Sequence, residues 1–163
     1  MSDNSQGRLQ VRRGFTILEL VVVLAISAAF LGFAGWTFGA YVHRTSAQRA
    51  AQLFARDLAL ARASAIRGRE PVVIRFNEAS RWYRISTLGS GTEIVRRRFG
   101  VGGDLHLTTI DLVAPGDSIV FSARGVAEGL TGSGSLGEAR FTSNQIRYSV
   151  HFNRMGASRV HES

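Results

Sequence analysis

The stretch that decides the fold of this chain is residues 13–44, RGFTILELVVVLAISAAFLGFAGWTFGAYVHR. From Leu20 to Val42 it contains no charged residue. As an α-helix rising about 1.5 Å per residue, this run spans roughly 35 Å, which is enough to cross a bilayer core of about 30 Å. Trp36 and Tyr41 lie near its far end, where interfacial aromatic residues are expected. The stretch therefore predicts a membrane-spanning helix.

A basic leader precedes the apolar run, with Arg8, Arg12 and Arg13 against a single acid, Asp3. By the positive-inside rule, this leader stays in the cytoplasm and the C-terminal part is exported. An ordinary signal peptide would have a shorter apolar region followed by small residues at its cleavage site. Here the apolar run is longer and Gly14 precedes it. A buried core helix fits less well, because the apolar run is uninterrupted and has a basic flank.

Glu19 stands at the start of the apolar run. An ionisable residue inside a membrane is costly unless paired, and is by default a functional candidate. A plainer explanation is that Glu19 lies at the interface, where the dipole of a helix N-terminus favours an acid. The position of Glu19 alone leaves both explanations open.

The segment from Arg13 to Leu20 resembles the processing site of type IV prepilins and type II secretion pseudopilins. A basic leader ends in Gly14, followed by Phe15, Thr16 and then Glu19, four residues beyond the Phe. The resemblance implies cleavage between Gly14 and Phe15 by an inner-membrane prepilin peptidase, with N-methylation of Phe15. It also implies that Phe15, Thr16 and Glu19 act in assembly. A Glu19 carboxylate could neutralise the Phe15 amine of a neighbouring subunit, because either charge alone is expensive in an apolar setting.

Beyond His43 the chain becomes polar but keeps a helical period. One apolar stripe recurs at spacings of three and four: Ala47, Ala51, Phe54, Leu58, Ala61 and Ala65. We expect the helix to continue to about Ile66 and to end near Gly68, with Pro71 just beyond. The sequence thus divides into a cleaved leader (1–14), a transmembrane half-helix (15–43), an amphipathic half-helix (44–68) and an exported β-rich domain (69–163).

After Pro71 the pattern changes to short strands separated by turns. The expected strands are Val72–Phe76, Trp82–Thr87, Glu93–Phe99, Leu105–Thr108, Ile119–Ser122, Ala139–Thr142, Ile146–Phe152 and a short one near Ser158–His161. In the segment 146–152, apolar and polar residues alternate, which predicts one buried and one wet face. The fold class expected is α+β and pilin-like, with a long N-terminal helix packed on a C-terminal antiparallel β-sheet domain.

The glycine-rich segment from Gly125 to Gly137 has no Lys and opens no helix, so we interpret it as a mobile surface loop and not as a phosphate loop. The segment from Ser118 to Val126, which overlaps the start of this loop, is similar to one in the H-type minor pseudopilins and the related FimT-like minor pilins. In that family segment a Pro usually stands near the place of Ala123. The closing segment 146–150, with Gly156 and Arg159, also resembles that family.

The residues that most enzymes and metal sites require are missing or scattered. The chain has no Cys, which excludes disulfides and thiolate ligands, and no Lys. Neither a G-x-S-x-G elbow nor a closely spaced histidine pair is present. A calcium site stays open as a hypothesis, although its candidate ligands form no dense ligand loop; they are Asp104, Asp111 and Asp117. We predict no enzyme activity, no catalytic residue, no cofactor and no metal.

The net charge of +8 comes entirely from Arg, and the densest basic run is Arg96-Arg97-Arg98. On a strand, Arg97 would face opposite to its two neighbours. A solvated edge strand that discourages aggregation is the favoured interpretation. A more specific alternative is a contact with an anion or with DNA, for which the candidate residues are Arg96, Arg97, Arg98, Arg154 and Arg159.

The resemblance implies a minor pseudopilin near the tip of a type II secretion pseudopilus, supporting export of folded proteins across the outer membrane. Its partners would be other major and minor pseudopilins, the prepilin peptidase and methylase, and the inner-membrane secretion platform. It would be single-pass in the bacterial inner membrane, with the N-terminus cytoplasmic and the C-terminal domain periplasmic. The alternative is a FimT-like minor pilin that binds DNA during uptake, so a nucleic-acid partner stays open. A third hypothesis is an anchored exported domain outside any filament.

Overall fold

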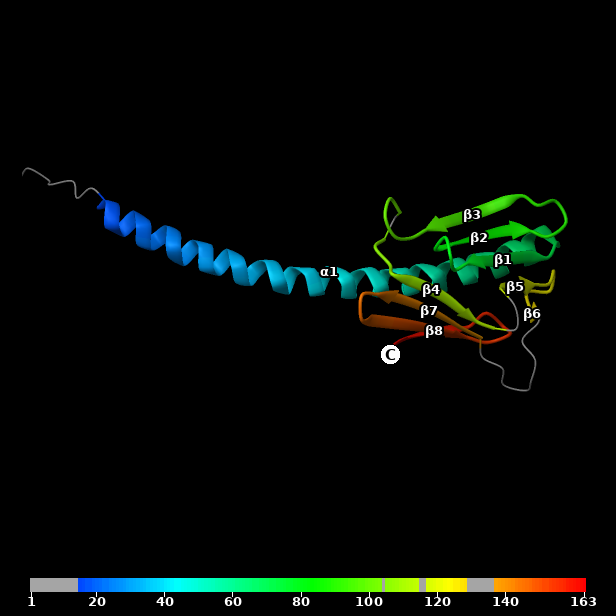
Figure 1. Cartoon of the computed structure of the whole chain (residues 1–163). Coiled ribbons are helices and arrows are strands. Elements are labelled where there is room, and N and C mark those ends of the chain that lie inside the picture. The colour runs from blue at the N-terminus through cyan, green and yellow to red at the C-terminus, as the bar shows by residue number, and fades with distance from the viewer. Residues whose placement is uncertain (1–14, 104, 115–116, 129–136) are drawn as a thin grey trace, which may run out of the picture. The chain divides into compact units, whose positions relative to one another are not determined.

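The computed structural model describes residues 15–103, 105–114, 117–128 and 137–163, and leaves aside the side chains of residues 33–40 (Figure 1). Two compact units make up the chain, Met1–Gly39 and Ala40–Ser163. The predicted leader, residues 1–14, and most of the glycine-rich loop, residues 129–136, lie outside the described residues.

One helix, α1, covers Ile17–Gly68 and contributes to both units. It begins directly after Thr16 and ends at Gly68, where Arg69 takes the left-handed φ of 50° and Pro71 follows. The Arg69 amide donates to the carbonyl of Ile66 and tightens this last turn. The expected helix end near Gly68 is confirmed.

In the first unit, the large apolar side chains of α1 between Ile17 and Leu31 are solvent-exposed. No helix in the described part of the chain is long and apolar enough to cross a membrane. The membrane span expected over residues 15–43 includes the side chains left aside, and it stays a prediction.

The second unit contains two antiparallel sheets (Figure 1). The first has the strand order β3-β2-β1-β5-β6, formed by Glu93–Arg98, Trp82–Thr87, Val72–Asn77, Ser118–Phe121 and Ala127–Glu128. The second has the order β4-β7-β8-β9, formed by Thr109–Val113, Gly137–Ser143, Ile146–Phe152 and Ser158–Glu162. The expected class, a helix packed on antiparallel β structure, is confirmed.

Two details of the strand prediction are wrong. The strand expected at Leu105–Thr108 begins instead at Thr109, because β4 takes its register from β7, where Ile110 pairs with Phe141. Leu105 makes only an isolated bridge to Phe99. Ser149, expected on the wet face of β8, is fully buried, and its hydroxyl lies 3.0 Å from that of Ser163. Ser163 at the C-terminus therefore covers part of the face of β8 that the alternation of apolar and polar residues predicts to be exposed to solvent.

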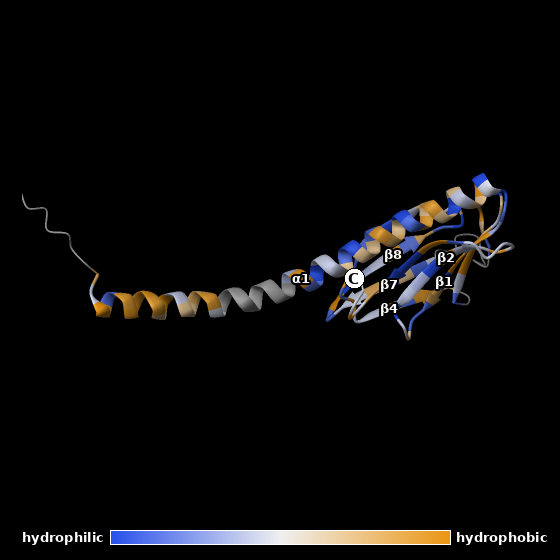
Figure 2. Cartoon of the chain, turned by 90° about the horizontal axis from the view of Figure 1, so that it is seen from above, coloured by the Kyte–Doolittle hydropathy of each residue, from blue (hydrophilic) through white to orange (hydrophobic). Residues whose placement is uncertain are grey.

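The core lies between α1 and the two sheets, and the whole predicted stripe of the helix is buried in it. Figure 2 shows this part of α1 as alternating apolar and polar turns lying along the strands. Phe54 packs at 5.4 Å, centroid to centroid, against both Phe76 and Tyr83 of the first sheet. It also packs against Phe141 and Phe152 of the second sheet, at 5.5 and 6.2 Å. One side chain thus joins the helix to both sheets.

Candidate functional site

The N-terminal end of α1 carries the residues that the sequence singled out for processing and assembly. Phe15 and Thr16 precede the helix, and Glu19 lies in its first turn. The hydroxyl of Thr16 accepts a hydrogen bond of 3.2 Å from the Glu19 amide, which is the geometry of an N-cap. Gly14 lies outside the described residues, so cleavage before Phe15 stays a prediction. Phe15, just before the helix, and Glu19, in its first turn, are both exposed.

A largely apolar surface follows this helix start, with Glu19 and Ser27 as its exposed polar residues between Ile17 and Leu31. The exposed large side chains are Phe15, Ile17, Leu18, Leu20, Val21, Val22, Val23, Leu24, Ile26, Phe30 and Leu31. Contiguous apolar surface of this extent marks a site that contacts lipid or protein. The surface has the chemistry that an assembling or membrane-inserted helix needs.

A partly buried ion pair joins the second part of α1 to the first sheet. The Asp57 carboxylate accepts from Arg97 Nε at 2.9 Å and from Arg97 Nη2 at 3.2 Å. It also accepts a 2.8 Å hydrogen bond from the Tyr83 hydroxyl. Burial and the neighbouring carboxylate raise the pKa of Tyr83 well above its usual range, so Tyr83 remains a donor. This cluster ties α1 to β2 and β3.

Asp57 and Tyr83 were missed by the sequence analysis. The one signal was an acid placed three residues after Phe54 and next to Leu58, on the margin of the apolar stripe. An acid in such a position needs a partner that sequence spacing cannot supply, because Arg97 lies 40 residues away.

The basic run Arg96-Arg97-Arg98 is split between the two faces of β3, as the alternation predicts. Arg97 faces the helix and pairs with Asp57, so its principal partner belongs to the fold. Arg96 pairs with Glu93 at 2.7 Å, and Arg98 is exposed. β3 is an edge strand of the first sheet, with Arg96 and Arg98 exposed on one face and Arg97 partly buried on the other.

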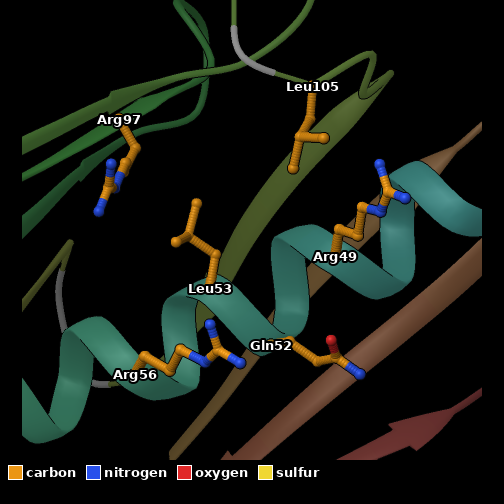
Figure 3. A pocket seen from close by; sticks show the side chains of 6 residues that line it. All are labelled: Arg49, Gln52, Leu53, Arg56, Arg97 and Leu105. Carbon is orange, nitrogen blue, oxygen red and sulfur yellow. The ribbon is translucent and has the colours of Figure 1, made fainter.

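A pocket of about 370 Å³ opens beside Arg97 (Figure 3). Arg49 and Arg56 of α1 line the same pocket, and Leu53 and Leu105 point toward each other from opposite sides of it. Its described lining residues include three arginines and no acid. Since the Arg97 guanidinium already pairs with Asp57, Arg49 and Arg56 are the cations that this pocket offers to an anion.

Arg154 and Arg159 are exposed and lie elsewhere in the second unit. Arg159 is on β9, an edge strand of the second sheet, and Arg154 is in the turn between β8 and β9. Arg159 lines a hollow of about 520 Å³ together with His151, Asn153, Ala157, Ser158 and His161. The structure thus does not bring the five candidate arginines together into one site.

Near the C-terminus, Arg44 of α1 holds the last strand. It donates a 2.8 Å hydrogen bond to Glu162, which also accepts a hydrogen bond of 2.9 Å from the Tyr148 hydroxyl. The hydrogen bonds from Tyr148 and Arg44 keep the pKa of Glu162 below its ordinary value. These contacts make β9 part of the helix-bound domain.

In the described residues, no group of three or more potential ligands gathers for a metal ion. Asp104 lies outside them, Asp111 is in β4 and Asp117 directly precedes β5. The described residues thus bring together no site for the calcium that the sequence left open.

Two family descriptions match the chain. The type II transport protein GspH family matches residues 50–156, and the prokaryotic N-terminal methylation motif matches residues 9–35. Comparison with curated proteins gave no match.

Solved structures of minor pilins and pseudopilins share the fold. The type IV minor pilin FimU of Pseudomonas aeruginosa (strain PAO1) gives a TM-score of 0.57 at 18% identity, over 74% of this chain and 92% of FimU. The minor pseudopilin EpsH of the Vibrio cholerae type 2 secretion system gives a TM-score of 0.51 at 13% identity, over 72% of this chain and 97% of EpsH. At these identities the likeness establishes the fold alone. Because the GspH match spans more than half of the 163 residues, the chain belongs to the type II transport protein GspH family of pilin-like subunits.

Proposed function

We propose that this chain is an H-type minor pseudopilin, a structural subunit near the tip of a type II secretion pseudopilus that supports export of folded proteins. The observation that carries the proposal is the GspH match over residues 50–156, which extends from the helix stripe to Gly156. The N-terminal methylation motif over residues 9–35 supports it independently, because it lies entirely outside the first match.

The proposed processing removes residues 1–14 and frees an amine at Phe15. The helix start suits this chemistry, since Thr16 caps α1 and Glu19 lies in its first turn. In an apolar surrounding, the amine of one subunit and the Glu19 carboxylate of another gain more from pairing than they would in water. The pair would fix the axial register between neighbours.

In this account residues 15–43 hold the subunit in the inner membrane before assembly, with the domain of residues 69–163 in the periplasm. The exposed apolar surface of the first unit supports it, because that surface needs lipid or another subunit to cover it. The same surface would then contact other pseudopilins, while the prepilin peptidase and the inner-membrane platform would act on the N-terminal end.

Replacement of Glu19 tests the assembly role. Glu19→Gln keeps the size of the side chain and removes its charge, so we expect pseudopilus incorporation and secretion to fall sharply while the protein remains in the membrane. Co-purification of cross-linked neighbours and the amount of secreted protein outside the cell report the two effects. Glu128→Gln, at an exposed acid on β6, is the matched control. Normal incorporation of Glu19→Gln would favour an anchored domain outside any filament.

A FimT-like minor pilin is the second candidate, and the fold likeness to FimU is consistent with it. In that case DNA would bind at Arg154 and Arg159. The expected signature is salt-dependent DNA binding that Arg154→Gln and Arg159→Gln weaken. Genes neighbouring that of this chain would then encode a type IV pilus, whereas secretion genes there would favour the pseudopilin.

A further inference from the structure

The outer face of the first sheet carries a row of arginines directly across three strands. The inward side chains of β1 and β2, such as Ile74 and Tyr83, are buried in the core. On the opposite face of the same strands, Arg75 of β1 pairs in register with Arg84 of β2, and Arg84 pairs in register with Arg96 of β3. Because neighbouring strands lie about 4.8 Å apart, the three side chains start within roughly 10 Å of one another. We refer to Arg75, Arg84 and Arg96 as the arginine ladder.

The next row of the same face adds to the ladder. Trp82 pairs in register with Asn77 on one side and with Arg98 on the other. Arg84 and Arg96 both lie over the Trp82 ring, each 5.8 Å from its centroid. Such cation–π contacts order the guanidinium groups without neutralising them.

The ladder has no evident role in folding. Like charges directly opposite in a sheet are destabilising, and this arrangement places two such pairs side by side. Of its three members, Arg96 has an ion pair, with Glu93. In the described part of the chain, no ion pair reaches Arg75 or Arg84, and the buried Nε of Arg84 has no hydrogen-bond partner. The fold therefore supplies little anionic charge to this face.

The opposite face of β3 shows what an arginine of this strand binds. There the Arg97 guanidinium donates two hydrogen bonds to the Asp57 carboxylate. Carboxylates match the planar guanidinium fork, and Arg is favoured wherever such recognition matters. A nucleic-acid strand would instead need an open aromatic surface for base stacking, and the guanidinium groups already occupy the Trp82 ring.

We propose that the arginine ladder binds a carboxylate-rich segment of a partner protein, whose Asp or Glu side chains pair with Arg75, Arg84 and Arg96. The partner adds negative charge to a face on which Glu93 is the one described acid paired with the ladder. This interaction surface is separate from the N-terminal half of α1 and goes beyond the proposed function, because it requires neither processing nor filament assembly.

The test uses the full-length chain in a nonionic detergent and a fluorescein-labelled deca-glutamate peptide. Fluorescence anisotropy gives the affinity. Two variants are compared: the ladder variant Arg75→Gln/Arg84→Gln/Arg96→Gln, and a control, Arg67→Gln/Arg124→Gln/Arg147→Gln, at exposed arginines outside β1, β2 and β3. Both lose the same charge. We expect the ladder variant to bind at least about tenfold more weakly than the control, which corresponds to roughly half a kcal/mol for each lost pair.

A second readout places the peptide on the sheet. In a Trp36→Phe background Trp82 is the sole tryptophan, and its emission should change on peptide binding. Equal weakening in the two triple variants would mean that net charge alone attracts the peptide, and would overturn the proposal. Ladder-dependent binding of deca-thymidylate that is tighter than peptide binding would overturn the choice of a carboxylate partner. Should the ladder variant fail to fold, Arg84→Gln alone carries the same comparison against Arg124→Gln.

Discussion

At the scale of single residues, Asp57 fixes α1 to the first sheet, because its carboxylate accepts hydrogen bonds from both Tyr83 and Arg97. The carboxylate is 5% exposed and the Arg97 side chain 30%, so water offers little substitute on the Asp57 side. Removing one partner of such a pair leaves charge poorly solvated, which costs more than the pair itself contributes.

Substitution of Asp57 tests this reasoning. Asp57→Ala should lower the free energy of unfolding by about 3 kcal/mol, because Arg97 and Tyr83 lose their acceptor. Tyr83→Phe should cost only about 1 kcal/mol, the net worth of one hydrogen bond. Urea denaturation followed by circular dichroism measures both. Glu128→Ala, at an exposed acid, should stay within about 0.5 kcal/mol of the parent. A loss for Asp57→Ala no larger than for Glu128→Ala would contradict the structural role.

Glu138 gives the domain a defined response to acid. Two hydrogen bonds of 2.8 Å from Arg140 are the main reason that its pKa is lowered from 4.5 to about 2. A group whose pKa falls on folding stabilises the folded state above its unfolded pKa. That contribution is therefore complete above about pH 4.5 and is lost as the pH falls toward 2.

The expected difference appears in Glu138→Gln. Its melting temperature should lie below that of the parent at pH 6 and converge on it near pH 2. The stability difference at pH 6 should be about 1 kcal/mol, once solvent screening of the half-exposed Arg140 is allowed for. Thermal melts between pH 2 and 6 provide the comparison. A difference that is constant over this range would show that the Glu138 charge is not the cause.

At the scale of elements, the apolar stripe of α1 and the inner faces of the two sheets form one core, and Phe54 touches rings of both. The side chain is fully buried. Its loss would leave a cavity at the point where the helix and both sheets meet.

Phe54→Ala should therefore lower the free energy of unfolding by about 3–5 kcal/mol. Gln52→Ala, at an exposed position of the same helix, should change it by less than about 0.5 kcal/mol. Chemical denaturation at constant pH gives both values. A loss below about 2 kcal/mol for Phe54→Ala would mean that the site refills by local collapse and that the two sheets do not depend on this ring.

Local patterns predicted the elements well, because their physical causes are local. The three- and four-residue spacing of Ala47 to Ala65 buries one helix face, and the alternation in β8 orients its side chains apart from Ser149. The division into two sheets, the start of β4 and the short β6 depend on pairings between distant strands. The partnership of Asp57 with Arg97 and the arginine ladder depend on the same long-range pairings. Sequence periodicity carries no information about such contacts.

At the scale of the whole molecule, the chain combines a GspH-family domain with an N-terminal methylation motif. The candidate processing and assembly residues Gly14, Phe15, Thr16 and Glu19 were found from the motif, since their role depends on recognition by a peptidase and by neighbouring subunits. The fold of one isolated chain contains little trace of those interactions beyond the cap at Thr16 and the exposed apolar helix surface.

The measurement that tests this account most directly is the intact mass and N-terminal sequence of the protein recovered from its native membrane. The account predicts a chain that begins at N-methylated Phe15 and lacks residues 1–14. A chain that still begins at Met1, or one cut after residue 30, would contradict prepilin processing and the pseudopilin function built on it.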